Sequence, residues 1–243
     1  MSHSCDPDSL SLGVVRFRPT TNTAIARKAH GLAKFLVVLD VDSTLIENEV
    51  IELLAAHAGS EAEVAELTTR AMNGELDFEQ SLRSRVATLA GQPVSVLAES
   101  GRAIRVTHGA QEMIAAVVAA GGHVAAVSGG FHELLDPLAH SLGLSYARAN
   151  RLEVLDGRLT GRLVGAVIDA QAKADALREW ARDSDTPLSA TIAVGDGAND
   201  LLMMEAAALS VGITAKPIVR ATADVHIDTR DLSALLPLLG LRS

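Results

Sequence analysis

Four runs of mostly apolar residues constrain the fold of this chain more than any other feature of its sequence. They lie at Phe35–Leu39, His123–Val127, Thr191–Val194 and Leu209–Ile213. None alternates regularly between apolar and polar residues, as a strand with one solvated face would. Each run therefore predicts a strand that is buried on both faces, which is typical of a parallel sheet covered by helices on either side.

Helical patterns separate these runs, so strands and helices alternate along most of the chain. The helices are expected at Gly109–Ala120, Gly130–Leu142, Ala170–Arg182 and Asp200–Ala207. This alternation predicts an α/β fold, a Rossmann-like, doubly wound parallel sheet with right-handed crossovers. A small β-hairpin is also expected over 152–160, because Asp156-Gly157 is a favourable hairpin turn.

The interval between about Ile46 and Arg105 departs from this alternation. It contains four helical patterns and no apolar run between them; these are Asn48–His57, Ser60–Met72, Asp77–Ala90 and Pro93–Ser100. An all-helical insertion directly after the first strand predicts a cap over the carboxyl edge of the sheet. The expected boundaries are an N-terminal arm at 1–33, an α/β core domain at 34–46 and 106–243, and a helical cap domain at 47–105.

Charge and cysteine content exclude several classes of function. The formal net charge is −9, which argues against binding to nucleic acid or to an anionic membrane surface. Cys5 is the only cysteine, so no intrachain disulfide can form, as expected in a reducing cytoplasm. No apolar stretch is typical of a signal peptide or of a membrane span. We expect a soluble, cytoplasmic protein that is a monomer or a homodimer.

Polar clusters follow three of the four apolar runs. They are Asp40-Val41-Asp42, Ser128-Gly129 and Asp196-Gly197-Ala198-Asn199-Asp200. Lys173 lies between the last two clusters in the sequence. The carboxyl ends of parallel strands meet at one edge of a doubly wound sheet, and ligands bind there. We therefore expect these side chains to converge on one site.

The chemical types of these groups fit phosphoryl transfer. Several carboxylates repel one another unless a hard cation such as Mg²⁺ binds among them. A carboxylate attacks phosphorus only when the charge of the phosphate is neutralised, which calls for a metal ion and a lysine such as Lys173. The leaving alkoxide needs a proton, and Asp42 lies two residues beyond Asp40, where it can act as the second acid. Ser128 and the N–H of Gly129 could hold phosphate oxygens.

Taken in order, DVDST, SGG, the lysine and GDGAND closely resemble the motifs of the haloacid dehalogenase superfamily of phosphatases. The resemblance runs from about Val37 to Pro217. Residues 71–85, AMNGELDFEQSLRSR, together with Glu49, resemble the cap of the phosphoserine phosphatases in that superfamily. DxDST alone has an appreciable chance frequency, but the ordered set with the cap motif is very specific.

The resemblance implies a reaction and a role for each matching core residue. The implied reaction is hydrolysis of O-phospho-L-serine to L-serine and phosphate, the last step of serine biosynthesis. Asp40 would be the nucleophile, and Asp42 would be the general acid and then the base. Mg²⁺ would bind Asp40, the backbone carbonyl of Asp42 and Asp196, with Asp200 as support. The implied contacts to the phosphorylated substrate are Ser128, Gly129, Lys173 and Asn199.

The resemblance also implies roles in the cap. Arg85 would pair with the carboxylate of the substrate and Glu49 with its ammonium group, while Met72 and Phe78 would shield the site. A zwitterionic amino acid needs one fixed charge of each sign, and arginine can hold a carboxylate in a bidentate fork. Two segments depart from the family pattern. Thr107-His108-Gly109 stands where Thr-Pro-Gly is common, and Thr214-Ala215-Lys216-Pro217 where Asn-Ala-Lys-Pro is common, so the second segment is left out of the predicted site.

Other interpretations remain open from the sequence. Asp40 and Asp42 taken alone could be turn formers, Met72 and Phe78 could be cap core, and the charges around Arg85 could form a solvated helix face. The same phospho-aspartate could pass its phosphoryl group to another alcohol, such as homoserine, instead of water. A receiver-like binding module also phosphorylates a strand-end aspartate, but it lacks an acid at the position of Asp42 and has no helical cap of this size.

Overall fold

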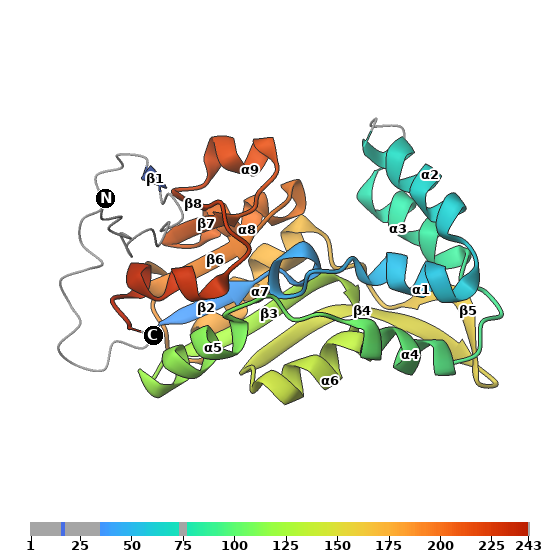
Figure 1. The fold of residues 1–243 in the computed structure, drawn as a ribbon, viewed down its shortest axis with the longest axis horizontal. Helices are drawn as coiled ribbons and strands as arrows, with labels where there is room; N and C mark the ends of the chain where they lie inside the picture. Colours follow the sequence, from blue (N-terminus) through green and yellow to red (C-terminus); the bar gives the residue numbers. More distant parts are fainter. Residues whose placement is uncertain (1–15, 18–34, 73–76, 243) are drawn as a thin grey trace, which may run out of the picture.

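The computed structural model describes residues 16–17, 35–72 and 77–242, and a mixed eight-stranded sheet runs through its centre (Figure 1). The predicted N-terminal arm lies outside the described residues except for the pair 16–17. In spatial order the strands are β1 (Arg16–Phe17), β8 (Val225–Ile227), β7 (Leu209–Ile213), β6 (Thr191–Gly195), β2 (Leu36–Leu39), β3 (His123–Phe131), β4 (Tyr146–Leu155) and β5 (Arg158–Val164). β1 and β5 pair antiparallel to their neighbours, and the other pairs are parallel.

Strand β2 lies in the middle of the sheet and is buried on both faces. It pairs in parallel with β3 on one side and with β6 on the other. Val37 and Leu39 pack into one hydrophobic cluster, while Leu36 and Val38 pack into a second cluster on the opposite face. All four side chains are fully buried. The continuous apolar run therefore serves two cores at once, as the sequence predicts.

Helices cover both faces of this sheet (Figure 1). On one face α5 (Ala110–Ala119) and α6 (His132–Leu142) pack with the short helix η5 (Leu232–Leu235). On the other face lie α7 (Ala170–Asp183), α8 (Leu201–Ala206) and α9 (Pro217–Thr222), whose apolar side chains form one hydrophobic cluster that includes Trp180 of α7. The remaining short helices are η2 (Val41–Leu45), η3 (Leu188–Ala190), η4 (Ala198–Asp200) and η6 (Pro237–Leu239). None of the described helices is both long and apolar enough to cross a bilayer.

The inserted interval contains four helices joined by short turns within its described residues. It forms α1 (Val50–Ala58), α2 (Glu61–Met72), α3 (Phe78–Ala87) and α4 (Ser95–Ala103). A capping box begins α3, because Asp77 Oδ1 accepts a hydrogen bond from Gln80 N at 2.7 Å and Gln80 Oε1 accepts one from Asp77 N at 3.4 Å. The chain enters and leaves this interval side by side, with Glu47 N donating to Arg105 O at 2.8 Å.

The predicted hairpin is present but belongs to the sheet. Its strands are β4 and β5, and Asp156 and Gly157 form the turn with φ angles of 50° and 72°. β4 begins at Tyr146, earlier than predicted, and pairs in parallel with β3 before it turns into the hairpin. The end of the hairpin also contacts the inserted helices, since Gly91 N donates to Leu159 O at 2.8 Å. The hairpin therefore connects the sheet to the helical insertion.

The α/β class and the order of its main elements are confirmed, with differences at several boundaries. β3 continues through Ser128 to Phe131, so α6 begins at His132 and not at Gly130. The short strand β8 and helix α9 are absent from the predicted elements. Both are too short to show a recognisable period in the sequence.

Candidate active site

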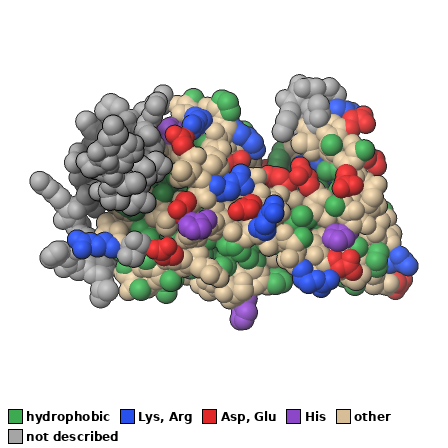
Figure 2. Space-filling model, viewed as in Figure 1, with side chains coloured by type: hydrophobic (Ala, Val, Ile, Leu, Met, Phe, Trp, Pro, Cys, Tyr) green, Lys and Arg blue, Asp and Glu red, His purple; other side chains and the backbone are tan. Residues whose placement is uncertain are grey.

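A cavity lies at the carboxyl edge of the sheet, between the strand ends and the inserted helices. Figure 2 shows the molecular surface hollowed between two raised parts, with acidic and basic side chains gathered around the hollow. The strand ends of the α/β core and the inserted helices both contribute residues to the cavity wall. The lining residues include Asp40, Asp42, Glu49, Phe78, Arg85, Gly129, Gly130, Asp196, Asn199 and Lys216.

Asp40 and Asp42 reach this cavity because the chain turns sharply after β2. The backbone N–H of Asp40 still donates to Val194 O at 2.9 Å, as in a strand. Ser43 then adopts a φ of 59°, a left-handed conformation that is uncommon outside glycine. The turn brings Asp42 back over the cavity, where its Oδ1 accepts a hydrogen bond from Val50 N at 3.2 Å. The two acids thus lie on the same cavity wall, as the sequence predicts.

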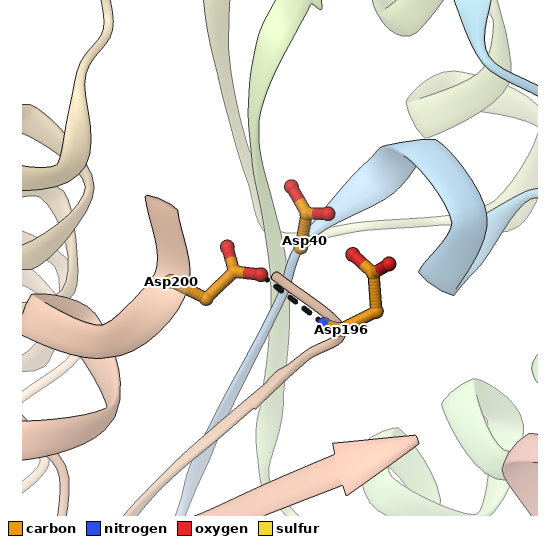
Figure 3. A group of neighbouring side chains, drawn as sticks. All are labelled: Asp40, Asp196 and Asp200. Carbon is orange, nitrogen blue, oxygen red and sulfur yellow. Dashed lines mark hydrogen bonds between the residues drawn. The ribbon is translucent and has the colours of Figure 1, made fainter. Parts of the chain in front are cut away.

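Asp196 and Asp200 follow β6 and face Asp40. Figure 3 shows the three carboxylates turned toward one another, with the backbone N–H of Asp196 donating to Asp200. Asp200 is fully buried, and its Oδ2 accepts from the backbone of Asp196 at 3.2 Å and of Gly197 at 3.0 Å. Asp200 therefore fixes the loop that presents Asp196.

These three acids fit a hard divalent cation. Asp40, Asp196 and Asp200 each offer one carboxylate oxygen, and the three oxygens lie within 4.8 Å of one another. Burial raises the pKa of Asp40 well above its ordinary value, and the nearby Asp200 raises it further. Burial also raises the pKa of Asp196. Asp40 and Asp196 are thus two buried acids with raised pKa values beside the buried Asp200, and a bound cation with oxygen ligands is favourable in such an environment.

Lys173 lies behind the acids and not on the cavity wall. Helix α7 places it one turn after the N-cap Asp169, and its side chain is fully buried. Nζ contacts Asp40 Oδ1 and donates to Asp200 Oδ1 at 2.8 Å. Burial alone would lower the pKa of Lys173, but Asp200 and Asp40 outweigh it and raise the pKa. The lysine is a permanent cation that orients Asp40.

The Ser128-Gly129 segment forms the end of β3 next to Asp42. Ser128 is buried, and its Oγ accepts a hydrogen bond from Gly130 N at 2.7 Å. A Cβ atom at position 130 would lie 3.2 Å from Asp42 Oδ2 and 2.9 Å from Ser128 Oγ. Glycine at 130 therefore permits Asp42 and Ser128 to approach the same point.

Side chains from the insertion close the other side of the cavity. Glu49 accepts a hydrogen bond from Ser43 Oγ at 2.7 Å. Phe78, at the first turn of α3, reaches Gly129, where an added Cβ would lie 3.1 Å from its ring. Arg85 is half-buried, and its burial lowers the pKa of the guanidinium. The side chain of Met72 lies outside the described residues.

The ionisation of Asp42 differs from that of an ordinary aspartate. Burial, and then the nearby negative charge of Glu49, raise the pKa of Asp42 to about 7. A carboxyl group with this pKa can hold a proton near neutral pH and can also release it. That property is required of a general acid and base.

Several residues at the site are absent from the predicted set, and two of them have polar side chains that make contacts there. Lys216 lines the cavity, and its Nζ lies 3.3 Å from Asp196 Oδ2. The sequence feature that could have identified Lys216 is its position shortly after the apolar run Leu209–Ile213, where a further strand end is expected. Asn150, buried on β4, donates to Gly129 O at 2.8 Å and Gly130 O at 3.2 Å, and accepts from Ile168 N at 2.8 Å. Nothing in the local sequence distinguishes this asparagine.

The sequence of the chain matches known protein families and curated proteins. Residues 37–205 match the haloacid dehalogenase-like hydrolase family. The chain is 52% identical over 217 residues to a phosphoserine phosphatase of Streptomyces coelicolor, covering 89% of this chain and 53% of that protein. It is 47% identical over 204 residues to a phosphoserine phosphatase of Lactococcus lactis, covering 84% and 94%. The chain thus spans about half the length of the first relative and nearly all of the second.

Solved structures share the fold as well as the sequence. A phospho-aspartyl intermediate analogue of phosphoserine phosphatase aligns with a TM-score of 0.80 and 44% identity, covering 85% of this chain and 99% of that chain. A substrate-bound phosphoserine phosphatase complex aligns with a TM-score of 0.80 and 43% identity, covering 85% and 98%.

Proposed function

The chain belongs to the haloacid dehalogenase-like hydrolase family, and on that premise we propose that it hydrolyses O-phospho-L-serine to L-serine and phosphate through a phospho-aspartate on Asp40. In this proposal the reaction is the last step of L-serine biosynthesis and takes place in the cytoplasm. The support is a chain that is similar over most of its length to phosphoserine phosphatases, and a cavity whose residues suit that chemistry.

One observation carries the proposal. A single cavity is lined by Asp40 and Asp42 from the core and by Glu49 and Arg85 from the insertion. The core acids suit a phosphoryl group, and the other pair supplies one negative and one positive charge. The ammonium group and the carboxylate of phosphoserine would therefore each have a partner of opposite charge, while its phosphate would lie against the acids that are proposed to attack it and to hold the cation.

The first chemical step follows from the positions of the two aspartates. One carboxylate oxygen of Asp40 attacks phosphorus, and the bond between phosphorus and the serine oxygen breaks. Asp42 gives its proton to that oxygen, so that serine leaves as a neutral alcohol. Lys173 keeps Asp40 oriented and partly offsets the charge that collects around the phosphoryl group.

The second step returns the enzyme to its starting state. Asp42, now a carboxylate, removes a proton from water, and the water oxygen attacks phosphorus. The bond between phosphorus and Asp40 breaks, and phosphate is released. Ser128 and the backbone N–H of Gly129 are proposed to hold phosphoryl oxygens in both steps, and Asn199 lines the same cavity.

The acid cluster fits a divalent cation, for which we propose Mg²⁺. Asp40, the backbone carbonyl of Asp42 and Asp196 would hold it, and Asp200 would support Asp196. When bound, the ion would supply neutralisation of the charge on the phosphoryl oxygens.

A phosphate-release assay over small phosphate esters, with and without EDTA, tests the proposal. We expect release from phosphoserine to be far faster than from sugar phosphates or nucleotides, and to stop in EDTA. Equal rates on all esters would contradict the assignment of phosphoserine as the specific substrate, but not the assignment of the protein as a phosphatase. Activity that survives full chelation would contradict the metal assignment.

The nucleophile is tested by Asp40→Asn. Because the amide cannot form the acyl phosphate, we expect turnover to fall below detection while the protein stays folded. Circular dichroism checks the fold, and acid-quenched wild-type enzyme should carry phosphate on Asp40 by mass spectrometry. Activity like that of the wild type in Asp40→Asn would eliminate this mechanism.

A further inference from the structure

Lys216 is a cation at the active site that the proposed reaction does not use. It begins α9 as its N-cap and lies on the cavity wall. Its Nζ is 3.3 Å from Asp196 Oδ2, while its backbone N–H donates to Asp196 O at 2.8 Å. Among the residues described, Asp196 is paired with no other cationic side chain.

The two lysines of the site differ in their freedom to move. Lys173 is fully buried and is held by both Asp40 and Asp200. The side chain of Lys216 is 56% exposed. Its backbone is fixed, because the neighbouring Ala215 is buried and Thr214 N donates to Ile227 O at 2.8 Å. Lys216 is thus anchored at the main chain, while more than half of its side chain is exposed and free to reorient.

We propose that Lys216 is a displaceable counter-ion of Asp196, a positioning residue that neutralises this acid when the site is empty and competes with the divalent cation for it. The inference rests on the proposed function, because it assumes that Asp196 is a metal ligand. A cation on Asp196 would lie close to the ammonium group of Lys216, and the two positive charges would repel each other. Lys216 therefore weakens the binding of the ion, and the bound ion drives the ammonium group away from Asp196.

The expected size of the effect follows from the exposure of Lys216, because its partner Asp196 is buried. An ion pair that reaches the surface contributes roughly 0.2 to 1 kcal/mol, which corresponds to a change of up to about fivefold in a dissociation constant. Removing the charge of Lys216 should therefore tighten cation binding by about two- to fivefold. The gain should shrink as salt is added, because ions screen the exposed ammonium group.

Titration calorimetry of the full chain with Mn²⁺, a cation that prefers the same oxygen ligands, tests the inference. Lys216→Met keeps an unbranched side chain and removes the charge, so we expect its Kd for Mn²⁺ to fall about two- to fivefold at low ionic strength. Lys216→Arg restores the charge and should return the Kd to the wild-type value. If Lys216→Met does not fold, Lys216→Gln replaces it.

Arg220→Met is the matched control. Arg220 lies on the same helix, is paired with the exposed Asp228, and does not line the cavity. This variant removes the same net charge, so a Kd like that of the wild type shows that the effect of Lys216 is local. An unchanged or higher Kd in Lys216→Met, with wild-type enzyme that binds Mn²⁺ and hydrolyses phosphoserine, overturns the counter-ion role alone. Wild-type enzyme that binds no Mn²⁺ overturns the proposed function and this inference together.

Discussion

Asp42 shows at the scale of one residue how a catalytic group can oppose folding. Its carboxyl group borders the cavity, and burial and Glu49 raise its pKa to about 7. The unfolded chain holds the same group at its ordinary pKa of 3.8. Between these two values the folded protein keeps a proton that the unfolded chain has lost. Stability therefore falls as pH rises through this window and stays lowered above it.

Asp42→Asn should remove this penalty. Asparagine has no charge and keeps an oxygen that can accept the hydrogen bond from Val50 N. We expect its free energy of unfolding, relative to wild type, to rise between about pH 4 and pH 7. Because the side chain borders a cavity that opens to the surface, we expect the free energy of unfolding to rise by about 1 kcal/mol or more. This gain is well below the free energy that the full pKa shift of Asp42 would correspond to. Urea unfolding in EDTA measures the gain without a competing cation.

An exposed acid provides the control for that experiment. Glu205 lies exposed on α8, and Glu205→Gln makes the same change in charge. Its relative stability should be nearly independent of pH over the same window. If Asp42→Asn raises the free energy of unfolding by the same amount at pH 4 and pH 8, ionisation of Asp42 does not destabilise the folded protein.

At the scale of elements, Asn150 joins three segments of the chain. From β4 its amide group donates to the carbonyls of Gly129 and Gly130 at the end of β3, and its oxygen accepts from Ile168 before α7. Asn150 is buried, and so is its bond to Gly130. The other two bonds are partly buried, so water is a poor substitute for the asparagine. The asparagine therefore holds the backbone that is proposed to bind phosphate.

Asn150→Ala should lower both stability and phosphate binding. Because three backbone groups lose their partner, one of them in a buried bond and two in partly buried bonds, we expect a loss of about 2 kcal/mol or more in the free energy of unfolding. We also expect a higher inhibition constant for inorganic phosphate, since the loop at Gly129 is no longer fixed. Asn48→Ala removes an amide that accepts from the exposed Arg105 N–H, and it should cost less. Unchanged phosphate inhibition in Asn150→Ala would contradict the positioning role.

The same elements show what the sequence can and cannot predict. β2 and β7 are visible because burial on both faces requires a continuous apolar run. The first half of β4 is not, because Arg148 and Asn150 interrupt its apolar residues and tertiary contacts decide its conformation. β8 has only three residues, one of them a histidine.

For the candidate site, the order of the motifs in the sequence predicts the polar residues that follow the strands. It does not predict the contacts between segments that are distant in the sequence. Asp40, Asp42 and Asp196 are predictable because they directly follow buried runs. Lys216 becomes part of the site only through the spatial neighbourhood of β7 and β6. The partners of Asn150 lie up to 21 residues away in the chain, beyond the reach of local patterns.

At the scale of the whole molecule, the cavity exists only because two segments meet. The core supplies the acids that suit a phosphoryl group, and the insertion supplies Glu49 and Arg85. Phe78 of α3 lies so near Gly129 of β3 that a Cβ atom added to the glycine would be 3.1 Å from its ring, so the two segments come close together at the cavity. Substrate selectivity should therefore depend on the insertion, while the chemical step depends on the core.

Arg85→Ala tests this division between the two segments. Wild-type enzyme should prefer phosphoserine to phosphoethanolamine, which has the phosphate and ammonium groups but no carboxylate. A charge-assisted pair contributes about 1.5 to 3 kcal/mol, so we expect kcat/KM for phosphoserine to fall roughly 10- to 100-fold, mainly through KM. The value for phosphoethanolamine should change little. Arg83→Ala is the matched control, because Arg83 pairs with the exposed Glu79 on the same helix and does not line the cavity. An equal loss on both esters would mean that Arg85 supports the shape of the insertion and does not recognise the carboxylate.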